Sequence, residues 1–128
     1  MSYYFAKTLA CEFDDAVRRT VEALKREGFG IITEIDVRDT LKKKIGADFR
    51  NYRILGACNP ALAHEALQLE DKVGTMLPCN VVVQDMGGGR TEVAAIDPVA
   101  SMQAIENPGL RDAAGKVQAK LRKVIESL

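Results

Sequence analysis

The sequence predicts a two-layer α+β domain in which a mostly antiparallel sheet packs against helices. Stretches typical of strands alternate with stretches in which apolar residues recur every three or four positions, as on one face of a helix. A glycine run, Gly87 to Gly89, separates two strand-like stretches and predicts a hairpin, which requires antiparallel pairing. No linker, low-complexity tract or internal repeat interrupts the 128 residues, so we expect a single domain over residues 1–128.

Five elements are expected in the N-terminal half. The first helix follows from apolar residues at steps of three and four between Phe13 and Leu24, and Gly28 ends it. Strands are predicted where aromatic and branched aliphatic residues gather. The elements are a strand over 3–9, a helix over 13–27, a strand over 31–37, a short helix over 38–45 and a strand over 52–58. The first strand–helix–strand unit could alternatively pair in parallel through a right-handed crossover.

In the C-terminal half, helix starts are indicated by a capping residue followed by proline. Asn59-Pro60 is typical of a helix cap and its first helical residue, and the same combination recurs at Asp97-Pro98 and Asn107-Pro108. The glycine run joins the most apolar strand to the strand that returns beside it. The elements are a helix over 60–69, strands over 77–86 and 90–96, a short helix from 98 and a last helix from 108.

Composition restricts the classes of partner and location. Eighteen basic residues balance eighteen acidic ones, and this net charge of zero argues against nucleic-acid or membrane-surface binding by electrostatic attraction. No segment approaches about 18 continuous apolar residues, so we expect no transmembrane helix, and the N-terminus does not resemble a signal peptide. The three cysteines, an odd number, then predict reduced thiols and a cytoplasmic location.

Several short stretches match a family pattern in their order and spacing. They are Gly28-Phe29-Gly30, Thr33 to Val37, Ile54 to Pro60, Ala63-His64, Leu77 to Val83 and Ala95 to Pro98. On these residues the chain resembles the bacterial and archaeal family called domain of unknown function 302, over nearly its whole length. The resemblance implies a small α+β fold and a homodimer. It implies no established activity, substrate or cofactor.

Two Cys-Asn pairs are the candidate functional residues. Cys58-Asn59 ends one predicted strand and Cys79-Asn80 begins the next, with one helix between them. If these strands are antiparallel neighbours, the two thiols lie at the same edge of the sheet. His64, in the second turn of the intervening helix, is close enough in sequence to join them. The candidate ligand-binding set is Cys58, Asn59, His64, Cys79 and Asn80.

Three kinds of chemistry suit this set. Cys58, Cys79 and His64 could hold a soft metal ion, although the cysteines lack the spacing of a CxxC motif. Cys58 directly precedes a helix N-terminus, whose partial positive charge can lower the pKa of a nearby thiol, so it is a candidate reactive group. Alternatively, both cysteines pack as small apolar side chains and Asn59 serves only as a cap. Cys11 is expected to be incidental.

A pair of carboxylates alternates along the second strand. Glu34 and Asp36 are expected on one face, opposite Ile31, Thr33 and Ile35. Two carboxylates at this spacing could share a ligand, but a solvated strand face is the more usual location for such residues. We therefore expect them to be exposed to solvent.

Two further motifs are expected to be structural. The Gly87–Gly89 run lacks the lysine and hydroxyl residue of a phosphate loop, and a strand follows it, so a hairpin turn is expected. A local basic patch has acidic neighbours and is expected to be a solvated helix face rather than a site for an anion. The patch consists of Lys42, Lys43, Lys44, Arg50 and Arg53.

These observations leave three functions open. The favoured hypothesis is a small binding module that holds a small ligand or soft metal near the two Cys-Asn pairs. The second is a thiol-based enzyme or redox factor, which the absence of a catalytic triad or a metal-spacing motif disfavours. The third is a structural protein that acts through a homodimer interface. Apolar stripes at 3–5, 99–105 and 110–128 exceed what one sheet face covers, which favours a two-fold dimer.

Overall fold

The structure, a computed structural model, describes residues 2–128. One sheet contains β1 (Tyr4–Leu9), β2 (Gly30–Asp36), β3 (Tyr52–Cys58), β4 (Cys79–Gly87) and β5 (Arg90–Ile96). The strand order is β1-β5-β4-β3-β2, and every neighbouring pair is antiparallel. The predicted antiparallel sheet is therefore confirmed. The parallel alternative for the first two strands is wrong, because β1 and β2 form opposite edges of the sheet.

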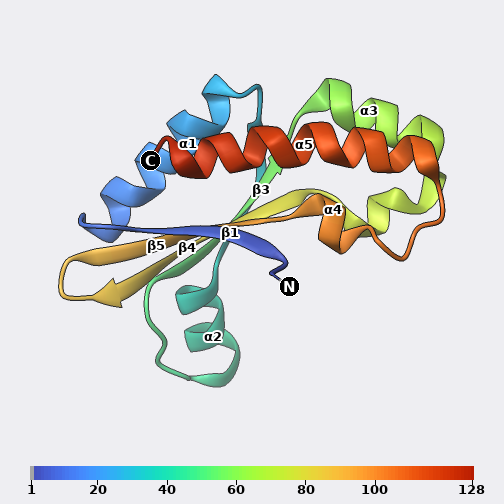
Figure 1. The fold of residues 1–128 in the computed structure, drawn as a ribbon. Coiled ribbons are helices and arrows are strands. Elements are labelled where there is room, and N and C mark those ends of the chain that lie inside the picture. Colours follow the sequence, from blue (N-terminus) through green and yellow to red (C-terminus); the bar gives the residue numbers. More distant parts are fainter. Residues whose placement is uncertain (1) are drawn as a thin grey trace.

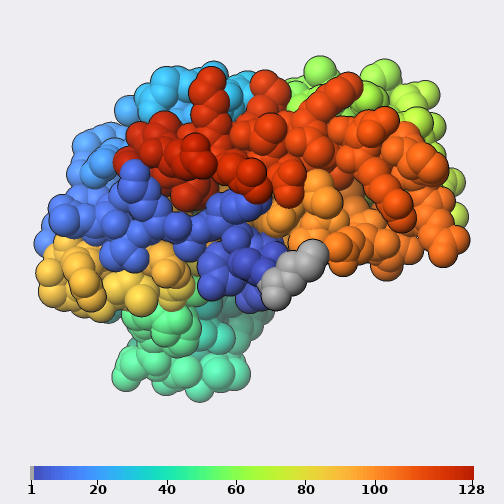
Figure 2. Space-filling model, viewed as in Figure 1, coloured from blue at the N-terminus to red at the C-terminus, as the bar shows by residue number. Residues whose placement is uncertain are grey.

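Helices cover one face of this sheet (Figure 1). The long helices α1 (Phe13–Arg26), α3 (Pro60–Leu69) and α5 (Pro108–Glu126) lie on the same side, whereas α2 (Val37–Ile45) projects from the other. The 3-10 helix η1 (Asp71–Met76) and the short helix α4 (Pro98–Ser101) complete the chain. In the space-filling view, α2 and the loop after it form a lobe that stands out from the body (Figure 2). This is the expected two-layer α+β arrangement.

Three helices begin at the capping residues that the sequence indicates. The side chains of Asn59, Asp97 and Asn107 each accept a hydrogen bond from a main-chain N–H group in the first turn of the following helix. Such a cap stabilises a helix by about 1 kcal/mol. The distances are 3.3 Å to the amide of Leu62, 3.0 Å to that of Val99 and 3.3 Å to that of Leu110.

A glycine sets the end of α1. Gly28 has a φ of 84°, a left-handed conformation that residues with a Cβ atom rarely adopt. The Gly28 and Phe29 amides donate hydrogen bonds to the carbonyl oxygens of Lys25 and Leu24, at 3.0 Å and 2.9 Å. The Phe29 ring is buried. This turn directs the chain from α1 into β2.

The edge strand β2 differs from its predicted pattern. A bulge between Ile31 and Thr33 shifts the register, so that Ile31 pairs with Ala57 and Thr33 pairs with Gly56. Ile31 packs against the core under the helices, as Ala57 does. The expectation that Ile31, Thr33 and Ile35 share one face is wrong, because the extra residue in the bulge reverses the alternation of side chains.

Buried side chains form two clusters. The larger lies between the sheet and the helices α1 and α5, and the smaller joins α3, η1, α4 and the first turns of α5. The smaller consists of Ala66, Val73, Met102, Leu110 and Ala114. Among residues 2–128, no helix has the length and apolar composition needed to cross a bilayer.

Candidate functional site

A cavity of about 270 Å³ lies where the two buried clusters meet. Its walls come from α3, α5, α4 and the ends of β3 and β4, and no charged residue of the described chain lines it. Asn59 and the thiols of Cys58 and Cys79 contribute the polar or polarisable groups. An apolar cavity of about 150 Å³ in another protein stays dry and binds benzene. This cavity is therefore large enough for a somewhat bigger apolar molecule.

Short side chains on two helices create the cavity. Ala63 and Ala66 line it from α3, and Ala113 and Ala114 line it from α5. An alanine side chain ends at Cβ, so two alanine-rich faces opposite each other leave a space that longer side chains would fill. None of these alanines was predicted to belong to a site. The signal that could have revealed them is the clustering of alanines on the inward faces of both helices.

The two cysteines lie at the same end of adjacent strands, as predicted. Cys79 is paired with Ala57 in the β3–β4 ladder, Cys58 is the next residue along β3, and both cysteines line the cavity. Cys58 is half-buried, whereas Cys79 is buried. Burial, with a smaller contribution from the nearby Cys58, raises the pKa of the Cys79 thiol to about 11. Cys79 is therefore a neutral thiol at pH 7, and its nucleophilicity is low.

Asn59 holds the start of α3 against the end of α1. Its Oδ1 atom accepts the hydrogen bond that caps α3, and its Nδ2 atom lies 3.0 Å from the position that a Cβ atom on Gly28 would occupy. The absence of a side chain at residue 28 thus leaves room for the Asn59 amide. The helix cap and the glycine turn together fix one rim of the cavity.

The chain has relatives of known family and structure. The model of the family described as "Domain of unknown function DUF302" matches residues 5–128. The chain belongs to the DUF302 family. The crystal structure of an uncharacterized conserved DUF302 protein from Bacillus stearothermophilus is similar, with a TM-score of 0.90 and 28% sequence identity, over 98% of each chain. No curated protein matches the chain. The resemblance inferred from the sequence motifs is confirmed.

His64 of this DUF302 protein does not join the cysteines. It is exposed, and its Nε2 atom lies 3.4 Å from Nε2 of Gln68, one turn further along α3. Leu62 and Ala66 line the cavity, and each is two residues from His64, which is about 200° around a helix. Within residues 2–128, no three His, Cys, Asp or Glu side chains are placed to hold a metal ion. The predicted convergence of His64 with both cysteines is therefore not found.

Asn80 lies on the opposite face of the sheet from Cys79. It is exposed, and it lines a shallow hollow on that face together with Val82 and Gln84. Successive strand residues point to opposite faces, so Asn80 cannot share a site with its buried neighbour Cys79. Of the five predicted site residues, the structure brings together Cys58, Asn59 and Cys79.

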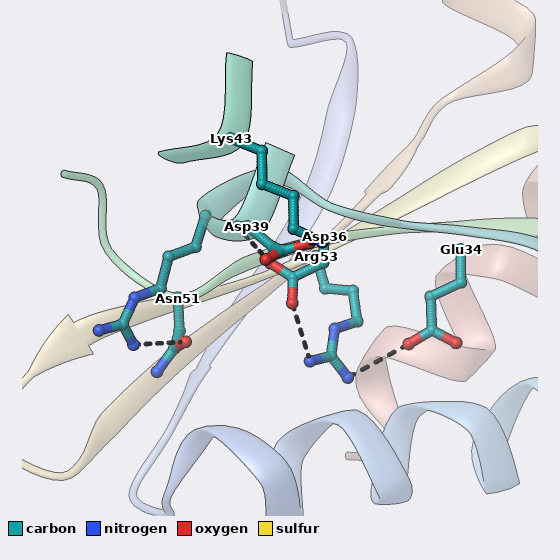
Figure 3. A network of polar contacts seen from close by, with 7 residues as sticks. Glu34, Asp36, Asp39, Lys43, Asn51 and Arg53 are labelled. Atoms are coloured by element: carbon teal, nitrogen blue, oxygen red, sulfur yellow. Dashed lines mark hydrogen bonds and ion pairs between the residues drawn. The ribbon is translucent and has the colours of Figure 1, made fainter. Parts of the chain in front are cut away.

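The two β2 carboxylates form ion pairs within the chain. Arg53 of β3 lies between Glu34 and Asp36 (Figure 3), with nitrogen–oxygen distances of 3.2 Å to Glu34 and 3.8 Å to Asp36. Its guanidinium carbon is 5.3 Å from the centre of the Phe13 ring. Arg53 thus occupies the position between the carboxylates that a shared ligand would take.

The glycine run and the lysines of the basic patch are placed as expected. Residues 87–89 all have positive φ; Gly87 ends β4, and Gly88 and Gly89 form the hairpin turn into β5. No residue of α2 is buried, and two of its lysines form ion pairs of 3.0 Å with neighbouring aspartates. These are Lys42 with Asp48 and Lys43 with Asp39. The three lysines form a solvated helix face, as expected, whereas Arg50 lies in the loop after α2 and Arg53 lies in β3, so the expectation of one helix face is wrong for these two arginines.

Proposed function

We propose that this DUF302 protein binds a small apolar molecule in the cavity between α3, α5 and the ends of β3 and β4. The observation that carries this proposal is a cavity of about 270 Å³ lined by no charged residue of the described chain. Ligand sites are typically concave and mostly apolar, so an apolar pocket of this size, which reaches the surface beside the exposed Ile32 and Leu67, favours a ligand. Asn59 and Cys58 supply polar contacts at one side of it.

Indole is a suitable probe for this proposal because the chain contains no tryptophan. Its fluorescence can be excited at wavelengths where tyrosine does not absorb, so the signal comes from the probe alone. Transfer into an apolar cavity should move the indole emission to shorter wavelength and saturate at one indole per chain. A probe of this size is expected to bind with a Kd on the order of 0.1–1 mM. An emission spectrum that the protein leaves unchanged would contradict the proposal.

A second candidate function, assembly as a homodimer, is favoured by the sheet face opposite the long helices. On that face, one set of residues paired across all five strands, and therefore running at right angles to the strands, is apolar throughout. The register aligns Ile35, Ile54, Val82, Ala94 and Ala6. Ile35 is 48% exposed. We propose that a second copy stacks on this row, since an uncharged row can face itself across a two-fold axis without repulsion between like charges.

Sedimentation equilibrium tests the dimer. A mass twice the 14.0 kDa of one chain is expected for the native protein. Val82→Lys, in the centre of the row, should give a mass near that of one chain. Ala119→Lys is the control, because Ala119 is exposed on α5, which lies on the other side of the sheet from the row. A native mass of one chain at every concentration, or dissociation by the control alone, would contradict the dimer.

We also propose a cytoplasmic location. All three cysteines, Cys11, Cys58 and Cys79, are free thiols, which suits a reducing compartment.

A further inference from the structure

A second hollow lies directly beside the cavity. Its volume is about 500 Å³, and it is bordered by α4, the segment after α4, and the first turns of α5. Three of its residues, Met102, Leu110 and Ala114, also line the cavity. A single layer of side chains therefore separates the two spaces.

Met102 is the adaptable part of this layer. It follows the four-residue helix α4 as its C-terminal cap and is buried in the smaller cluster. A methionine side chain is unbranched, with three rotatable bonds, and it readily takes other conformations in a core. Ala114 has only a methyl group at the same boundary. Rotation of the Met102 side chain would thus open this layer where the two spaces lie closest.

The outer hollow differs from the cavity in its polar groups. Arg111 is the one charged residue among the described residues that line either space, and Gln103 lies in the same hollow. Within residues 2–128, no carboxylate lies within 4.0 Å of the Arg111 guanidinium, whereas Lys116, one turn and a half further along α5, is paired with Glu65. Arg111 is exposed and available to an anion that enters the hollow.

We propose that the two spaces form one binding tract for an elongated amphiphile, a fatty acid-like molecule. Its hydrocarbon tail lies in the cavity past Met102, and its carboxylate lies in the outer hollow against Arg111 and Gln103. This assignment rests on the proposed function, because it names the ligand class of the same cavity. The cavity has no charged residue from the described part of the chain to pair with a carboxylate, so the Arg111 guanidinium in the outer hollow sets the direction in which the molecule lies.

Binding of decanoate and of 1-decanol, both below the concentrations at which they aggregate, tests the tract by calorimetry. Arg111→Gln should weaken decanoate binding about fivefold and leave 1-decanol within about twofold, because only the carboxylate meets the guanidinium. Arg90→Gln is the matched control, since Arg90 lies at the hairpin and lines neither space. In the native protein, each methylene from octanoate to decanoate should tighten binding about fourfold.

The outcomes separate this assignment from the proposed function. If indole binds while decanoate does not, or if Arg111→Gln weakens acid and alcohol equally, the tract is refuted and the cavity remains a site for compact apolar molecules. An absence of binding by indole, decanoate and 1-decanol together would overturn both. The tract would be established if decanoate binds more tightly than 1-decanol to the native protein and to Arg90→Gln, and if this difference in affinity is lost in Arg111→Gln.

Discussion

The Asn59 amide occupies the space beside Gly28 that a side chain at residue 28 would need, with Nδ2 3.0 Å from the site of the missing Cβ atom. Gly28 also has a φ of 84°. Two independent requirements for glycine therefore coincide where the end of α1 meets the start of α3.

Substitution of Gly28 should lower the free energy of unfolding by more than the left-handed backbone angle alone would. Gly28→Ala should lower the free energy of unfolding by about 1–3 kcal/mol, because it adds contact with Asn59 to left-handed strain. Gly46→Ala is the matched control, with a φ of 65° and no atom within 4 Å of an added Cβ. Urea denaturation should give a loss of about 1 kcal/mol for the control. Equal losses in both variants would show that the Asn59 contact has no energetic weight.

Gly56 in β3 is a second position where a side chain has no room. An added Cβ would overlap Oγ1 of Thr33 and lie 2.7 Å from Cγ of Pro78. Gly56→Ala should therefore destabilise the protein by about 1–3 kcal/mol, as overpacking of a well-packed site does. Gly30→Ala, in the neighbouring strand with no atom within 4 Å, should change thermal stability little. A Gly56→Ala variant as stable as Gly30→Ala would contradict the packing described here.

The fold was largely predictable because its signals are local. The capping residues Asn59, Asp97 and Asn107 act within one helical turn, and the glycine run acts within one hairpin, so each can be inferred from neighbouring residues. The bulge at Ile31 could not be inferred in this way, because it depends on how β2 aligns with β3.

The site was only partly predictable for a similar reason. The proximity of Cys58 and Cys79 follows from strand order, which the sequence constrains. The exclusion of His64 depends on which face of α3 meets α5, a tertiary relationship. The position of Asn80 could have been predicted from the alternation of strand side chains. The cavity is a property of the space between helices, and no single residue signals it.

Alkylation should distinguish the two cavity cysteines. Cys58 is half-buried, whereas Cys79 is buried with its pKa raised to about 11. At pH 8, iodoacetamide should therefore modify Cys58 well before Cys79 in the folded protein. Peptide mass analysis of native protein, with Cys58→Ser as control, measures the order. Faster modification of Cys79 would contradict its burial, and unreactive thiols until unfolding would favour a packing role for both.

The Cys79 thiol should also make stability depend on pH. Its pKa in the folded state, about 11, is above the ordinary value of 9.0. The folded state therefore holds this proton more tightly than the unfolded state. The resulting stabilisation is complete below pH 9 and is lost as the pH rises through 11. Denaturation between pH 8 and 11 should show a steeper loss of stability for the native protein than for Cys79→Ala. Identical slopes would contradict the raised pKa.

The alanine-lined cavity is the proposed binding site, and a larger side chain on its wall should exclude the ligand. Ala113→Leu places a larger side chain on the cavity wall, whereas Ala119→Leu adds the same atoms to the exposed face of the same helix. Near-ultraviolet circular dichroism establishes that both variants are folded, and Ala63→Leu offers a second cavity-filling position on α3. The indole titration should show about tenfold weaker binding for the cavity variants and native affinity for Ala119→Leu. Native affinity in folded Ala113→Leu and Ala63→Leu would show that indole does not bind in this cavity.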